Sequence, residues 1–172
     1  MNYHLKQWMH CLKQCAKMTL LASSPERLPN SLHCIVFSFM SYLLVGLMLV
    51  NMQRSYSTII GHIALELILL TLITYIALRL KKTLSRMVQT LSALIGTNLI
   101  LTSISLPIYL LVVGNNGANE SLTQFEIYLS IALIFWNLAV LSLIFKRAFG
   151  IGTLASAMIS FNYFLLYQLI IV

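Results

Sequence analysis

Five runs of mostly apolar residues set the strongest limit on the fold of this chain. They extend over residues 33–52, 56–78, 87–113, 125–145 and 151–172. A helix of about 20 apolar residues is long enough to cross the hydrocarbon core of a bilayer. The sequence therefore predicts an all-α, multi-pass membrane protein with five transmembrane helices, in which Pro107 kinks the third helix or ends its regular part.

The composition excludes several classes of protein. Of 172 residues, 59% are apolar and only 9% are charged, whereas about a quarter of the residues of an ordinary soluble domain are charged. This balance argues against a cytosolic enzyme, a disordered tail and a nucleic-acid-binding module. The chain has no Asp, which removes calcium loops, Walker-type magnesium sites and Ser-His-Asp triads. We therefore expect neither catalytic residues nor a cofactor, and no nucleic-acid partner.

The basic residues predict the orientation of the five helices. All of them except Arg54 fall in segment 1–32, the loop after the second run or the turn after the fourth, and five helices place these three segments on the same side. Because positively charged loops stay in the cytoplasm, we expect the N-terminus to lie on the cytoplasmic side and the C-terminus on the opposite side. The predicted cytoplasmic basic rim contains Lys81, Lys82, Arg86, Lys146 and Arg147.

Residues 1–30 are predicted to form a cytoplasmic segment ahead of the transmembrane domain at 31–172. On a helical wheel one side carries apolar residues and the other carries cations, which is typical of an amphipathic helix at the membrane interface. The predicted apolar face consists of Leu5, Trp8, Met9, Leu12, Ala16 and Thr19. A linker containing Pro25 and Pro29 follows this helix.

Three residues of this predicted helix, His4, Cys11 and Cys15, share one flank and are of types that bind soft metal ions. The chain lacks the paired CxxC or HxxxH units of structural zinc sites. We therefore expect no metal. Cys11, Cys15 and Cys34 cannot all pair with one another, so a disulfide-stapled fold is not expected either.

A polar residue lies near the midpoint of each apolar run. The second run carries Glu66 there, with His62 one helical turn away, and each other run carries an amide or hydroxyl side chain at a similar depth. The predicted intramembrane polar cluster consists of His62, Glu66, Asn98, Asn137 and Asn162, with Ser41 and Tyr42 at the same depth of the first run. Such a layer either fixes the helices together through hydrogen bonds or forms a proton or substrate site centred on Glu66 and His62.

Small residues recur at four-residue spacing in two of the predicted helices. Gly152, Ser156 and Ser160 do so in the last helix, and Ser92 with Gly96 do so in the third. Small side chains at this spacing let helix backbones approach closely. We expect these positions to be packing surfaces.

Five closely spaced helices after a cytoplasmic N-terminal segment resemble the Yip (Ypt-interacting) superfamily of small polytopic membrane proteins. Two stretches are also similar to small bacterial inner-membrane proteins with this outline: residues 96–98 with Leu106-Pro107 downstream, and residues 135–140 leading to 146–148. This resemblance implies a bacterial inner-membrane protein with a periplasmic C-terminus. Because the short loops leave little room for catalytic apparatus, we expect a non-enzymatic scaffold, assembly factor or accessory subunit, with the lipid bilayer and a membrane-protein partner or a second copy of the chain as its contacts. The alternative is a small proton-coupled transporter or channel centred on Glu66 and His62.

Overall fold

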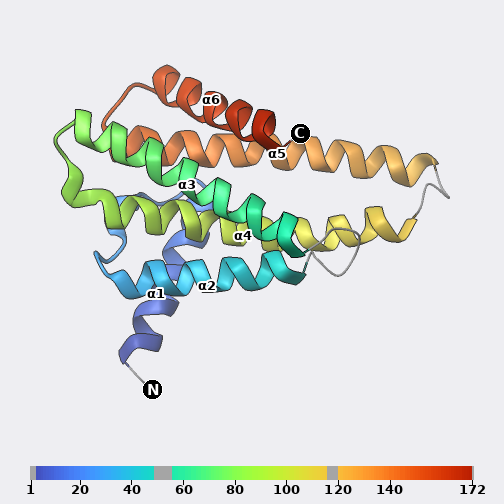
Figure 1. Ribbon diagram of the computed structural model, residues 1–172, viewed down its shortest axis with the longest axis horizontal. Coiled ribbons are helices and arrows are strands. Elements are labelled where there is room, and N and C mark those ends of the chain that lie inside the picture. The colour runs from blue at the N-terminus through green and yellow to red at the C-terminus, as the bar shows by residue number, and fades with distance from the viewer. Residues whose placement is uncertain (1–2, 49–55, 116–119, 172) are drawn as a thin grey trace.

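The computed structural model describes residues 3–48, 56–115 and 120–171, and every regular element within these ranges is helical. The long helices are α1 (Tyr3–Thr19), α2 (Leu32–Met48), α3 (Tyr56–Leu80), α4 (Met87–Asn115), α5 (Glu120–Phe149) and α6 (Thr153–Ile171). Two short 3-10 turns, η1 (Pro25–Arg27) and η3 (Leu84–Arg86), precede α2 and α4. Helices α2 to α6 lie side by side along the long axis, and α1 crosses them at a steep angle (Figure 1).

Four of these helices, α3 to α6, are long and apolar enough to cross a membrane. Helix α2 is equally apolar, but its described part has only 17 residues. The predicted end of this first run, at residues 49–52, lies outside the described residues, as does Arg54. The all-helical, multi-pass prediction is therefore confirmed for four helices.

Helix α4 is the centre of the bundle. It contacts α1, α2, α3 and α5, and 56% of its most apolar stretch is buried, compared with 17–22% in the other three long apolar helices. The core consequently forms around α4 residues such as Leu94, which packs in one cluster with Leu70 of α3 and Phe145 of α5. The outer sides of α3, α5 and α6 carry exposed apolar side chains, as expected for surfaces in contact with lipid.

Helix α1 packs on the bundle through a face that overlaps the predicted apolar face. Thr19 is buried, and Leu12 packs against a cluster of α2, α3 and α4 side chains, whereas Met9 is 43% exposed. Cys15 is fully buried and lies against Gly96 of α4, which has no side chain to exclude it.

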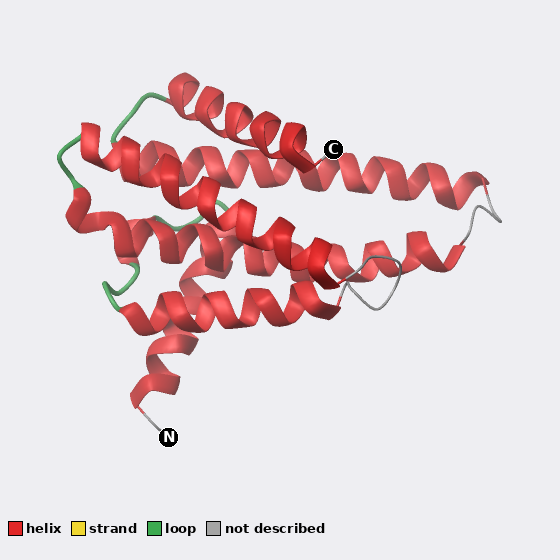
Figure 2. Ribbon diagram, viewed as in Figure 1, coloured by secondary structure: helices red, strands yellow, loops and turns green. Residues whose placement is uncertain are grey.

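The described connections gather at one end of the bundle. Figure 2 shows the loops before α2, between α3 and α4, and between α5 and α6 on the same side. The α5–α6 turn contains Gly150 with a φ of +62°, a left-handed conformation that glycine adopts without steric cost. The three basic segments of the sequence therefore lie at one end of the molecule.

Pro107 does not end its helix. Helix α4 continues through it to Asn115, although proline has no amide hydrogen to donate to the carbonyl four residues earlier. Buried and membrane helices tolerate such a residue when neighbouring groups or local adjustment satisfy the freed backbone. The regular part of this helix is thus longer than the proline suggested.

Candidate functional site

Two hydrogen bonds hold the Glu66 carboxyl group at the interface of three helices. The amide Nδ2 of Asn98 on α4 donates to Oε1 of Glu66 over 2.7 Å. The phenol of Tyr42 on α2 donates to Oε2 of the same carboxyl. Each oxygen therefore has a donor from a different helix, and the carboxyl joins α2, α3 and α4.

These three residues lie near the middle of their helices. Glu66, Tyr42 and Asn98 fall close to the midpoints of α3, α2 and α4, at the depth where an unpaired carboxyl would be most costly in a membrane. Glu66 thus sits where α2, α3 and α4 meet, with a hydroxyl and an amide group as its hydrogen-bond partners.

The other residues of the predicted polar cluster are more dispersed. His62 is partly buried on α3, one turn before Glu66. Asn137 on α5 is partly buried, and its Oδ1 has no hydrogen-bond partner among the described residues. The polar layer that joins Glu66 is formed by Tyr42 and Asn98.

Asn162 differs from the prediction, because the structure places it on an exposed face of α6. Its Nδ2 donates 2.9 Å to the carbonyl of Met158, four residues earlier in the same helix. A side-chain amide that bonds its own backbone in this way does not need to turn toward other helices. The neighbouring Tyr163, instead, is buried and faces the interior.

Of the predicted packing residues, Gly96, Ser156 and Ser160 are buried and Gly152 is exposed. Gly96 is buried in α4, and a Cβ built there would lie 2.4 Å from Sγ of Cys15. Ser156 and Ser160 are buried, and the hydroxyl of Ser156 lies 3.1 Å from that of Ser142 on α5. Gly152 is corrected: it lies in the exposed turn before α6, and a Cβ there would meet nothing within 4 Å.

A cluster of thiols connects α1 to α2. Cys11, Cys15 and Cys34 form no disulfide and are buried in one core cluster, and Sγ of Cys15 donates 3.9 Å to the carbonyl of Ser92 on α4. The hydrogen bond with Cys15, followed by burial, raises the pKa of the Cys11 thiol well above its ordinary value. Within the described ranges, no group of three or more His, Cys, Asp or Glu side chains is arranged to hold a metal ion.

Two hydrogen bonds attach the end of α1 and its linker to α5. Trp136 donates from Nε1 to the carbonyl of Thr19 over 2.9 Å, and the guanidinium of Arg147 donates to the carbonyl of Ser23. Backbone carbonyls near a helix C-terminus lack intrahelical donors, so these side chains satisfy groups that would otherwise need water. The N-terminal segment is therefore fixed to the bundle.

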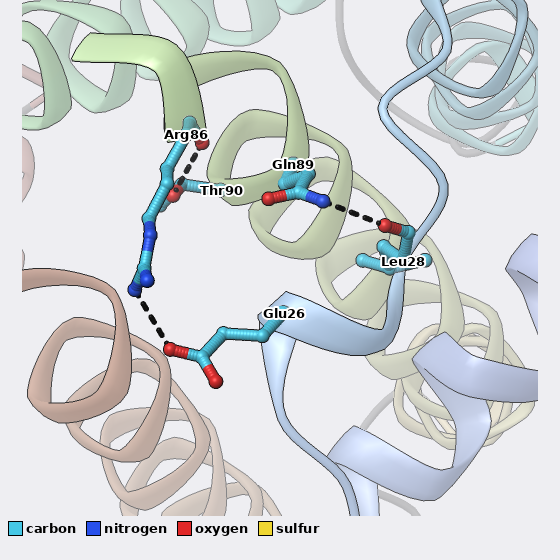
Figure 3. A network of polar contacts seen from close by, with 5 residues as sticks. All are labelled: Glu26, Leu28, Arg86, Gln89 and Thr90. Carbon is cyan, nitrogen blue, oxygen red and sulfur yellow. Dashed lines mark hydrogen bonds and ion pairs between the residues drawn. The ribbon is translucent and has the colours of Figure 1, made fainter. Parts of the chain in front are cut away.

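A second set of contacts attaches the linker to α4, as Figure 3 shows. Arg86 forms an ion pair with Glu26 over 2.7 Å, and Nε2 of Gln89 donates 3.0 Å to the carbonyl of Leu28. The remaining predicted rim residues, Lys81, Lys82 and Lys146, are exposed. The basic residues are thus partly structural, because two of the arginines hold the linker in place.

Sequence reasoning placed Glu66, Asn98 and Tyr42 in one polar layer from their depth, but it missed the role of Trp136. Nothing in the sequence indicated that Trp136 would reach the carbonyl of Thr19, because the two residues are far apart in the chain.

The chain matches no family model, no curated protein and no solved structure. Its function is therefore inferred from its own residues.

Proposed function

We propose that this chain is a five-helix inner-membrane protein of a bacterium that acts as a scaffold, assembly factor or accessory subunit of a membrane complex. In this proposal α2 is the fifth transmembrane helix. Its described 17 residues extend about 25 Å at 1.5 Å per residue, and the sequence continues with apolar Leu49 and Val50. If α2 crosses the membrane, segment 1–32, the α3–α4 loop and the α5–α6 turn all lie on the same side, where their basic residues can remain in the cytoplasm.

In this proposal the first turns of α1 lie at the membrane interface. The C-terminal half of α1 packs into the bundle, because Cys15 lies against Gly96 of α4, two residues before Asn98, and Trp136 of α5 reaches the carbonyl of Thr19.

The pairing of Glu66 is the single observation that carries the scaffold proposal. Both carboxyl oxygens accept hydrogen bonds from neighbouring helices, one from Tyr42 and one from Asn98. Interhelical bonds of this kind stabilise a membrane bundle and fix the register of its helices. A carboxyl group with a hydrogen-bond donor on each oxygen is suited to holding helices together. Proton exchange, by contrast, needs an open route from the carboxyl to water.

The exposed apolar faces support the same function. Helices α5 and α6 have only 17% of their most apolar stretches buried within the chain. Large exposed side chains on α5 include Tyr128 and Phe135. These faces are available to lipid and to a membrane-protein partner or a second copy of the chain.

A proton-coupled transporter centred on Glu66 and His62 is the second candidate. The observation that favours it is the placement of an ionisable carboxyl at the junction of α2, α3 and α4, one turn from His62. Such a group can take up and release a proton if a change in helix packing exposes it to water. The two candidates make opposite predictions for Glu66→Gln.

The test compares the full-length protein, Glu66→Gln and the control Glu126→Gln in liposomes that contain a pH-sensitive dye. The scaffold proposal predicts the same proton permeability of the liposomes for all three proteins. On native gels it predicts that Glu66→Gln migrates at the same position as the wild-type protein and its associated complex. Proton flux that Glu66→Gln abolishes and Glu126→Gln preserves would reject the scaffold proposal in favour of transport.

Reporter fusions test the proposed topology separately. We expect a periplasmic reporter to be active at residue 118 and after residue 172, and a cytoplasmic reporter to be active when fused within segment 81–86. An inactive periplasmic reporter after residue 172 would overturn the five-helix arrangement.

A further inference from the structure

A groove of about 530 Å³ lies at the basic end of the bundle. One wall is the linker from Ala22 to Arg27, which includes η1, and the other is the α5–α6 turn from Lys146 to Ile151. This volume is in the range of small-molecule sites, which is about 300–1,000 Å³. The groove is therefore large enough for a headgroup-sized ligand.

The charges that line this groove are mainly positive. Arg27, Lys146 and Arg147 contribute cations, and Glu26 contributes the only carboxylate among its lining residues. Figure 3 shows that Glu26 is directed to Arg86 of η3, with which it forms an ion pair over 2.7 Å. Because this pairing offsets the negative charge of Glu26, the groove presents three cations.

The cations are held in position by contacts that leave hydrogen-bond donors available. Lys146 uses one donor on Oγ1 of Thr153, over 2.7 Å, and Arg147 donates to the carbonyl of Ser23. An ammonium has three donors and a guanidinium has five. Ser24 adds a hydroxyl that does not cap η1, and Arg27 is exposed.

The α5–α6 turn forms one wall of the groove, and Gly150 is one of its lining residues. Gly150 adopts a φ of +62°, a conformation that glycine adopts without steric cost, so the chain can reverse here between α5 and α6.

We propose that this groove binds the phosphate group of an anionic ligand, the chemistry that an anionic phospholipid headgroup and a soluble phosphate share. Arginine and lysine side chains that converge from two segments suit phosphate oxygens, since arginine offers paired donors and lysine a compact charge. Basic pockets between membrane helices on the cytoplasmic side bind anionic headgroups. The lipid source rests on the proposed topology, whereas binding of a soluble phosphate does not.

The test uses the purified full-length chain in a neutral detergent. Phosphatidylglycerol is titrated against phosphatidylcholine, and bound lipid is counted by native mass spectrometry. In a separate arm, inorganic phosphate replaces the lipid, and binding is followed by thermal shift. The test variant is Arg27→Gln/Lys146→Gln, which removes two exposed cations of the groove. The matched control is Lys81→Gln/Lys82→Gln, which removes two exposed cations of the same end that do not line the groove.

We expect one phosphatidylglycerol per chain, with apparent affinity reduced about tenfold or more in the groove variant and less than about twofold in the control, and no comparable retention of phosphatidylcholine. If inorganic phosphate shows the same dependence on the variants and phosphatidylglycerol binds no better, the ligand is a soluble phosphate. Equal losses in the two variants would show attraction by the general charge of the rim and would overturn the proposal. No loss in either variant would also overturn it.

A charge-conserving variant separates the loss of a site from misfolding. Arg27→Lys/Lys146→Arg keeps both charges and should retain binding within about threefold. If this variant binds as weakly as Arg27→Gln/Lys146→Gln while both elute as monodisperse protein, charge in the groove does not determine binding and the proposal fails. Topology reporters distinguish this outcome from a failure of the proposed orientation, because phosphate binding in detergent does not depend on which side of a membrane the groove faces.

Discussion

Asn98 and Glu66 are joined by a 2.7 Å hydrogen bond that links the middle of α4 to the middle of α3. The bond is made between the most buried helix of the bundle and a neighbour whose other sides are mostly exposed. In an apolar surrounding, a carboxyl depends on such donors, because no water competes for it. The pair therefore fixes the depth at which α3 lies against α4.

Replacing Asn98 by Ala should lower the stability of the bundle by about 0.6–2 kcal/mol, since the carboxyl loses one of its two donors. The control is Asn162→Ala on the exposed face of α6, where the amide bonds only its own helix. Thermal unfolding in detergent measures both. Equal shifts for the two variants would contradict the interhelical role of Asn98.

Gly96→Ala should destabilise the contact between α1 and α4 by about 1–3 kcal/mol, a typical cost of overpacking. The new Cβ would lie 2.4 Å from Sγ and 3.3 Å from Cβ of Cys15. Adding Cys15→Gly removes both atoms and should recover part of the loss. Thermal unfolding of the single and double variants checks this.

The control for this prediction is Gly61→Ala on α3. A Cβ at Gly61 meets nothing within 4 Å, so alanine there should be neutral or stabilising by up to about 1 kcal/mol. If Gly96→Ala is as well tolerated as Gly61→Ala, α1 does not pack as closely on α4 as described.

Trp136→Phe should free the C-terminal turn of α1. The substitution keeps an aromatic ring but removes the Nε1 donor to the carbonyl of Thr19, at a cost of about 0.5–1.5 kcal/mol. Hydrogen–deuterium exchange of residues 16–22 should accelerate, whereas the neighbouring Phe135→Leu, at a side chain 68% exposed, should leave it unchanged. Unchanged exchange in Trp136→Phe would contradict the attachment.

The thiol of Cys11 should make the folded chain less stable as the pH becomes alkaline. Its pKa in the folded chain is raised above the ordinary 9.0, first by the hydrogen bond with Cys15 and then by burial. A raised acid pKa favours the protonated folded state, so this contribution is fully present below about pH 9 and is lost as the pH rises beyond it. The melting temperature should fall between about pH 8 and about pH 10.5.

Cys11→Ser is the matched variant, because its hydroxyl does not ionise in this range. Its melting temperature should fall less steeply over the same pH interval. If wild type and Cys11→Ser lose stability in parallel, ionisation of Cys11 contributes nothing to the alkaline transition.

The helices were predictable because a membrane-length apolar run has few alternatives. Helix α4 begins at the predicted residue, Met87, and α3 ends at Leu80, two residues after the predicted Leu78. Length and hydropathy decide these limits, and both are read directly from the chain.

Which side of a helix faces its neighbours was harder to predict. The wheel of α1 groups Met9 with Thr19, but the structure leaves Met9 43% exposed and buries Thr19 together with Cys11. Asn162 was expected inside and lies outside, because an amide can bond its own backbone. These outcomes depend on partners distant in the chain, such as Gly96 for Cys15, and one helix considered alone contains no information about them.

The order of synthesis has a consequence for Glu66. Asn98, whose amide bonds to Glu66, follows it by 32 residues, so Glu66 leaves the ribosome before Asn98 has been synthesised. Tyr42 precedes Glu66 by 24 residues and is therefore the one of the two donors that is present during this interval. The nascent chain can thus shelter this side chain with α2 first and complete the junction when α4 arrives.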